Sequence, residues 1–98
     1  MAELSDRAKQ LLEKQRQKYL SSLKNKHADL LALFKNRESQ EMELIDAVHR
    51  IAGSAGLHGL DVLQQSAVTA ERVLRDNGAT KEQQEHAVNS VLSKLLSQ

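Results

Sequence analysis

Hydrophobic residues recur at helical spacing in four blocks of the chain, and short polar or glycine-containing breaks separate the blocks. The first block has an apolar stripe made of Leu20, Leu23, Leu30, Leu31 and Phe34, with His27 on the same stripe. The second stripe is Leu44, Ile45, Val48, Ile51, Ala52 and Ala55. The third is Leu63, Ala67, Ala70, Val73 and Leu74, and the fourth is Gln84, Ala87, Val88, Val91 and Leu95. Four amphipathic helices with short connections predict an all-α fold, an antiparallel up-down four-helix bundle.

The breaks between the blocks contain residues that start or end helices. Ser39 is a candidate N-cap for the second helix, which we expect to end near Gly56 in the run GLHG. The third helix begins near Asp61 and stops at Asn77-Gly78. The segment Thr80–Gln83 has the spacing of a capping box and starts the fourth helix.

A weaker apolar stripe continues upstream of the first block, through Leu4, Ala8, Leu11 and Leu12. Residues 13–18, EKQRQK, bring no apolar side chain to that stripe. An unbroken helix from about Leu4 to Lys35 would be about 45 Å long, against about 25 Å for each later helix. We therefore expect an extended N-terminal helix that overhangs the bundle, with residues 1–18 as a helical extension and residues 19–98 as the bundle domain.

Composition narrows the classes of protein to which this chain can belong. At 98 residues it forms one small domain, and two aromatic residues with no proline favour helices packed through aliphatic side chains. A formal net charge of +1 provides no general field that attracts nucleic acid. The absence of cysteine excludes disulfides and thiolate metal sites, and no apolar run approaches the roughly 20 residues that span a bilayer. With no secretion signal at its start, we expect a cytoplasmic protein without membrane or nucleic-acid partners.

His49 is the residue with the most evident chemistry. On a helical wheel the second stripe centres near Val48, and His49 projects about 100° from it, at the edge of the buried face. Gly53 and Gly56 follow at i+4 and i+7 on the same side, although each glycine costs about 0.5 to 1 kcal/mol relative to alanine inside a helix. The pattern predicts an exposed imidazole beside cleared space. An imidazole near neutral pH can attack a phosphoryl group without a separate base.

Residues His49–Leu60 read HRIAGSAGLHGL, which resembles the signature of histidine phosphotransfer (HPt) domains, H-x-hydrophobic-K-G-S/A-S/A-x-x-hydrophobic-G-hydrophobic. In that family the histidine accepts phosphate from an aspartate of one receiver domain and gives it to an aspartate of another. The resemblance implies that His49 is the phosphoacceptor and that the partners are receiver domains of response regulators and hybrid histidine kinases. We expect the docking residues to be Arg50, Ala52, Gly53 and Gly56. The chain lacks a phosphate-binding glycine loop, so we expect a phosphocarrier without a cofactor, not a kinase.

Two positions depart from the family signature. Ala52 stands where lysine is common, and that lysine is thought to help hold the phosphoryl group electrostatically. Arg50 is a poorly oriented substitute for it. His58 stands where a hydrophobic residue is usual, which puts a polar group near the end of the bundle.

The remaining histidines have simpler interpretations. We expect His27 at the edge of the core and His86 in solvent. His58 lies nine residues after His49 and about half a turn away round an ideal helix, so we expect no shared metal site.

A basic run, Lys14 to Lys26, contains five basic and no acidic residues. Such a run is usually a solvated face, and the functional alternative is steering toward the acidic pocket of a receiver domain.

Two rival hypotheses remain open. One is a structural helical protein whose N-terminal helix pairs with another copy or with a larger partner. The other is an HPt descendant that docks on receivers without transferring phosphate, which Ala52 favours. We expect a monomer, with dimerisation through the N-terminal helix as the alternative.

Overall fold

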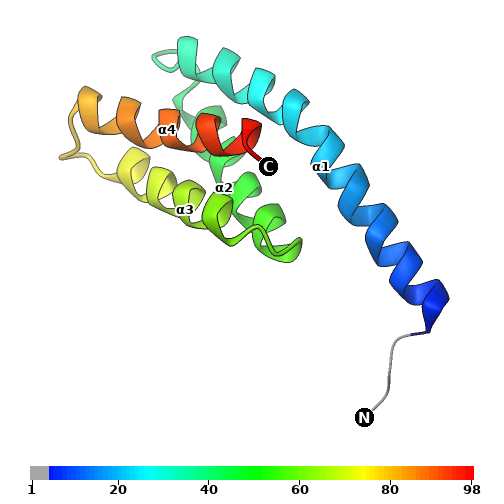
Figure 1. The fold of residues 1–98 in the computed structure, drawn as a ribbon. Coiled ribbons are helices and arrows are strands. Elements are labelled where there is room, and N and C mark those ends of the chain that lie inside the picture. The colour runs from blue at the N-terminus through cyan, green and yellow to red at the C-terminus, as the bar shows by residue number, and fades with distance from the viewer. Residues whose placement is uncertain (1–4) are drawn as a thin grey trace.

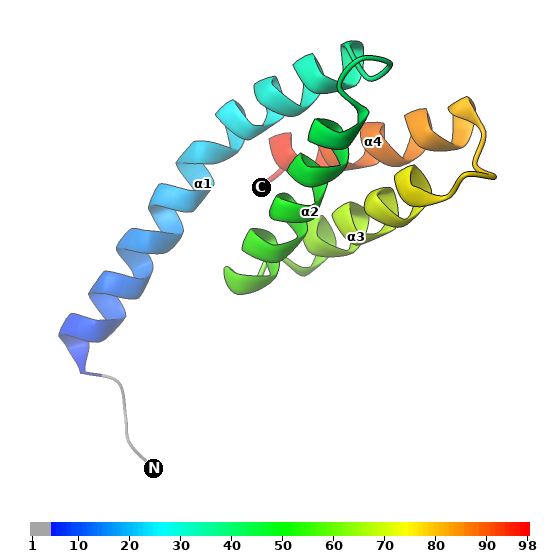
Figure 2. The same cartoon turned by 180° about the vertical axis from the view of Figure 1, so that it is seen from behind.

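The computed structural model describes residues 5–98, which fold into four helices without a strand. The helices are α1 (Asp6–Lys35), α2 (Glu41–Leu57), α3 (Asp61–Arg75) and α4 (Lys81–Leu96). Successive helices run in opposite directions, and α1 packs on α2 and α4 while α3 packs on the same two helices (Figures 1 and 2). The predicted all-α up-down four-helix bundle is confirmed. The expected helix start at Leu4 lies outside the described residues.

One hydrophobic core runs between the four helices. Its buried side chains are Tyr19, Leu23, Leu30, Phe34, Leu44, Ile45, Val48, Ile51, Ala52, Ala55, Leu60, Leu63, Ala67, Ala70, Leu74, Ala87, Val88, Val91, Leu92 and Leu95. The predicted stripes contain most of these residues but omit three of them, Tyr19, Leu60 and Leu92. They also include four residues that are only half-buried, Leu20, Leu31, Val73 and Gln84. Each helix packs against two neighbours, so its buried face is wider than a single stripe.

The connection between α1 and α2 corrects one predicted helix cap. Gln40, not Ser39, occupies the N-cap position of α2, and its side chain makes no capping hydrogen bond. The Ser39 hydroxyl instead donates to the carbonyl of Asn36 at 3.1 Å, and the backbone N–H of Ser39 donates to the same carbonyl at 3.0 Å. Ser39 therefore helps to close the turn after α1, one position too early to cap α2. Acidic residues Glu41 and Glu43 occupy the first turn of α2, where the helix dipole favours them.

The turn between α2 and α3 is a tight helix end of the Schellman type. Gly59 has a positive φ of 73°, which glycine adopts without the steric cost of a side chain. The N–H of Leu60 donates to the carbonyl of Ala55 at 2.9 Å, and the N–H of Gly59 donates to that of Gly56 at 3.2 Å. The expected end near Gly56 is therefore confirmed to within one residue. The predicted capping box of α4 is also present at Thr80–Gln83.

The first half of α1 projects beyond the bundle (Figure 1). Tyr19 is the first core residue of the helix, and upstream of it residues 6–18 are all exposed except the half-buried Ala8. This overhanging segment of 13 residues is about 20 Å long at 1.5 Å per residue. Leu11 and Leu12 are each 54% exposed on it. The predicted overhang is present, whereas the division into residues 1–18 and 19–98 as separate units stays a prediction.

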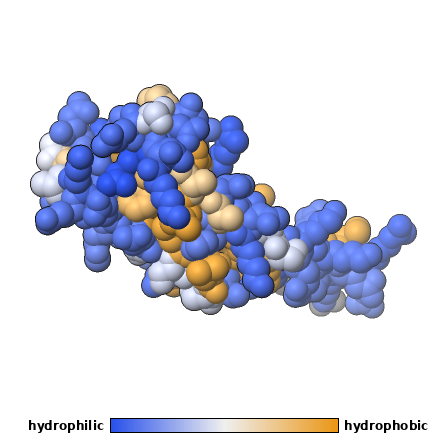
Figure 3. Space-filling model, turned by 90° about the horizontal axis from the view of Figure 1, so that it is seen from above, coloured by the Kyte–Doolittle hydropathy of each residue, from blue (hydrophilic) through white to orange (hydrophobic). Residues whose placement is uncertain are grey.

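Most of the surface in Figure 3 is hydrophilic, with an apolar band crossing the bundle. No helix within residues 5–98 is both long enough and apolar enough to cross a membrane.

Candidate functional site

His49 lies on α2 beside the fully buried Val48, and its side chain is 65% exposed. This is the orientation that the helical wheel predicts. Core residues on α2 hold the helix against α3, and the imidazole therefore projects from the boundary between the two helices. The position gives a partner protein direct access to the ring.

A carboxylate from α3 holds one side of the His49 ring. Nδ1 of His49 lies 3.0 Å from Oε1 and 3.1 Å from Oε2 of Glu71. A carboxylate only accepts hydrogen bonds, so Nδ1 is the donor and carries a proton. In the neutral ring Nε2 is then the unprotonated nitrogen, and it has no hydrogen-bond partner among residues 5–98. The arrangement leaves a nitrogen lone pair available for attack on an incoming group.

Glu71 is in turn bound to Arg75 on the next turn of α3. Nε of Arg75 donates to Oε2 of Glu71 at 2.9 Å, and the Glu71 side chain is only 19% exposed. The hydrogen bond from His49 is the main cause that lowers the pKa of Glu71; partial burial opposes it and Arg75 adds to it. The sequence analysis missed both residues. The only signal in the sequence was the i, i+4 spacing of Glu71 and Arg75, which is common on helix surfaces.

The lowered pKa of Glu71 predicts a pH-dependent contribution to stability. The ionised Glu71 stabilises the fold above the ordinary glutamate pKa of about 4.3, and this contribution is lost as pH falls through the lower pKa of the folded state. Denaturant unfolding of the native protein and of Glu71→Gln should therefore show a stability difference at pH 6 that shrinks as the pH is lowered toward about 3. A difference that stays the same across this range would contradict the assignment.

The predicted docking residues occupy different environments. Arg50 is 79% exposed and pairs with Asp46 at 2.8 Å, and it also lines a groove between α1 and α2 of about 410 Å³. Ala52 is only 7% exposed, so it presents almost no side chain to a partner. The side chain that bonds to His49 belongs instead to Glu71 on α3.

The two glycines beside His49 differ in what surrounds them. A Cβ built on Gly53 would meet nothing within 4 Å, so packing inside the chain does not explain that glycine. A Cβ on Gly56 would lie 2.3 Å from Nε2 of Gln64, the flexible end of a side chain on α3. The cleared space predicted from the sequence is therefore open at Gly53 and covered by Gln64 at Gly56.

Other residues of the signature connect α2 to α1. Ser54 and Tyr19 share a hydrogen bond of 2.7 Å between their hydroxyl groups. The ring of His58 stacks on that of Tyr19, with centroids 4.3 Å apart and planes 15° from parallel, and its carbonyl accepts a hydrogen bond from Arg16 at 3.3 Å. The departure at His58 thus places a half-buried ring that packs against α1. His27 is also half-buried and His86 is exposed, as the sequence predicts.

Tyr19 provides a spectroscopic test of this contact because it is the only tyrosine and the chain has no tryptophan. Burial raises the pKa of Tyr19, and the hydrogen bond with Ser54 opposes this shift. A raised pKa means that the stabilising effect is present below the ordinary tyrosine pKa of about 10 and is lost as pH rises through the folded value. We expect tyrosinate absorbance to appear at a higher pH in the folded protein than in the urea-unfolded protein. Above pH 10, Tyr19→Phe should lose less stability than the native protein. Coincident titrations of the folded and unfolded chain would contradict the burial.

The basic run from Lys14 to Lys26 is mostly solvated. Of its cations, Arg16 binds the carbonyl of His58, and Lys26 lies 5.3 Å above the Tyr19 ring while donating to Ser22. Lys14, Lys18 and Lys24 are exposed.

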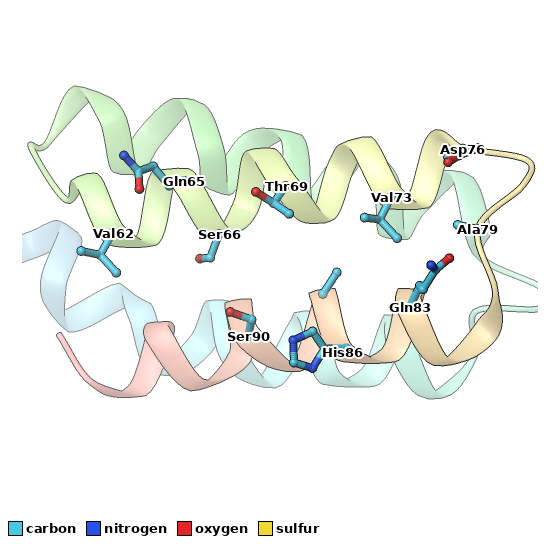
Figure 4. A pocket seen from close by; sticks show the side chains of 11 residues that line it. Val62, Gln65, Ser66, Thr69, Val73, Asp76, Ala79, Gln83, His86 and Ser90 are labelled. Carbon is cyan, nitrogen blue, oxygen red and sulfur yellow. The ribbon is translucent and has the colours of Figure 1, made fainter.

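A separate groove of about 540 Å³ lies between α3 and α4. Side chains from both helices point toward it, including Thr69 and Val73 from α3 and His86 and Ser90 from α4 (Figure 4). No residue of α2 lines this groove, so it is not part of the His49 site.

Comparison with known protein families agrees with the geometry of the site. No curated protein and no solved structure matches the chain. The sequence model of the Hpt domain family matches residues 1–98, essentially the whole chain. Members of this family are phosphocarriers with a histidine phosphotransfer role in phosphorelays, and they interact with receiver domains of two-component systems. With an exposed histidine on the second helix of a four-helix bundle and a family match along its length, the chain belongs to the Hpt domain family.

Proposed function

We propose that His49 relays a phosphoryl group between aspartates of two receiver domains. The observation that carries the proposal is the contact of Glu71 with Nδ1, because it leaves Nε2 of an exposed ring as the free nucleophile. In the first step the Nε2 lone pair attacks the phosphorus of a receiver's aspartyl phosphate. The N–P bond forms, the P–O bond to the aspartate breaks, and the electron pair leaves with the aspartate carboxylate.

The second step reverses this chemistry on the other receiver. Its aspartate oxygen attacks the phosphorus, the N–P bond breaks, and the electron pair returns to Nε2. Between the two steps the phosphorylated ring carries positive charge while Nδ1 remains protonated. The Glu71 carboxylate 3.0 Å from Nδ1 stabilises that charged ring.

The docking surface is centred on His49 and Gly53. The open space above Gly53 lets the backbone of a receiver approach the ring, and Arg50 lies at the border of that surface. Ala52 and Gly56 border this surface without presenting a side chain to the receiver, because Ala52 is buried and Gln64 covers Gly56. The exposed lysines of the basic run steer acidic receivers toward this surface, an effect that acts on association rate and weakens with salt.

One observation favours a second candidate function. Ala52 removes the cation that the family signature places one turn from the histidine. A protein that docks on receivers without accepting phosphate would tolerate that loss. The exposed Leu11 and Leu12 on the overhang would also permit self-association of this protein, which remains compatible with either function.

The deciding experiment incubates the protein with a receiver domain that carries radiolabelled phosphate. The relay predicts an acid-labile, base-stable label on the native chain and none on His49→Ala, which should keep the same helical circular dichroism. Binding of both proteins to the receiver, without label on either, would support the docking function instead.

A further inference from the structure

The carboxylate of Glu71 accepts hydrogen bonds from two residues, His49 and Arg75. Both of its oxygens lie within 3.1 Å of Nδ1 of His49, and Oε2 also accepts from Nε of Arg75. Arg75 is 57% exposed, and an exposed i, i+4 ion pair contributes little to the stability of a helix. The stability of the helix therefore does not explain this ion pair, and its effect on the orientation of Glu71 is the property to consider.

Arg75 is also the cation that the structure connects to His49. Ala52 supplies no charge, and Arg50 is engaged by Asp46 on its own helix and lines the groove toward α1. The connection from Arg75 runs through a single carboxylate, on the α3 side of the ring.

We propose that Arg75 is a positioning residue for phosphotransfer, which acts through Glu71 to keep the His49 ring in the tautomer with an unprotonated Nε2. The proposal rests on the proposed function of His49 and adds the group that orients it. By binding Oε2, Arg75 holds the carboxylate where its oxygens face Nδ1.

Two physical effects follow from this contact. The glutamate side chain has several rotatable bonds, so without Arg75 the carboxylate can turn toward solvent and release Nδ1; a proton on Nε2 then blocks the nucleophile. The second effect is electrostatic. Glu71 alone would place a negative charge beside the point where an anionic phosphoryl group arrives, and Arg75 neutralises that charge. Arg75 thereby supplies, from α3, a positive charge that Ala52 does not provide.

The first test measures the tautomer directly in the unphosphorylated protein. Imidazole ¹⁵N chemical shifts at a pH where the rings are neutral distinguish protonated Nδ1 from protonated Nε2, and His49→Gln identifies the His49 signals. We expect protonated Nδ1 in the native protein and a shift toward protonated Nε2 in Arg75→Gln. The matched control Arg72→Gln removes the same charge from an exposed position on α3 and should give the native spectrum.

The second test measures phosphoryl transfer from a labelled receiver. We expect the rate to fall about tenfold in Arg75→Gln, to recover in part in Arg75→Lys, and to stay within about twofold of native in Arg72→Gln. An unchanged tautomer together with an unchanged rate in Arg75→Gln would overturn the proposal, as would an equal loss in Arg72→Gln.

The two tests separate this inference from the function on which it rests. If the native chain takes no phosphoryl group from any receiver, the relay is wrong, and the ¹⁵N spectra still decide whether Arg75 sets the tautomer. If the native chain is labelled and Arg75→Gln matches it in both measurements, only the role of Arg75 is wrong.

Discussion

Replacing Gly53 with glutamine is expected to slow phosphoryl transfer about 100-fold while the protein stays folded. The new side chain would occupy the open space one turn from His49, where a receiver must approach the ring. Displacing the attacking nitrogen and the aspartyl phosphate by about 1 Å is enough for a loss of this size. The measurement is the initial rate of label transfer from a phosphorylated receiver, combined with its binding constant for the variant.

Stability and transfer should change in opposite directions at this position. Because nothing lies within 4 Å of the added Cβ, Gly53→Ala should raise the free energy of unfolding by about 0.5 to 1 kcal/mol. Ser93→Gln on the exposed face of α4 is a matched control and should leave transfer unchanged. Native transfer rates in Gly53→Gln would show that receivers do not dock over this part of α2.

Replacing Leu63 with alanine is expected to lower the free energy of unfolding by about 2 to 5 kcal/mol. Leu63 is fully buried on α3, so truncation removes apolar contacts and leaves a cavity. The same truncation at Leu12, which is 54% exposed on the overhang of α1, should cost less than about 0.5 kcal/mol. Urea unfolding monitored by circular dichroism measures both changes.

The pair of leucines also tests the predicted division at residues 18 and 19. If residues 1–18 form an extension outside the core, Leu12→Ala changes neither the midpoint nor the slope of the unfolding transition. A loss at Leu12 that is comparable to the loss at Leu63, and that depends on protein concentration, would instead show that the overhang is covered by a second copy.

The sequence predicted the helices well because their apolar spacing and glycine breaks are local properties. The buried face of α2 is the predicted one, and the positive φ of Gly59 explains why the run GLHG ends that helix. Local rules failed where two segments compete for one residue. Ser39 has the chemistry of an N-cap, yet its hydroxyl bonds to the preceding turn.

The geometry around His49 could be predicted from the sequence only in part, for a related reason. His49 and Gly53 belong to one helix, so their common side follows from their spacing alone. Glu71 reaches His49 from another helix, 22 residues later, and that contact depends on the register between α2 and α3. Helical spacing within one segment does not determine the register between two.

The connection between α2 and α3 has a consequence for how the site behaves during local unfolding. His49 and Glu71 face each other across a hairpin of two consecutive helices whose turn is only residues 58–60. Both residues lie outside α1, so the exposed start of that helix can fray and exchange its amide hydrogens rapidly without moving either of them. Fluctuations of the overhanging segment are in this way uncoupled from the chemistry at His49.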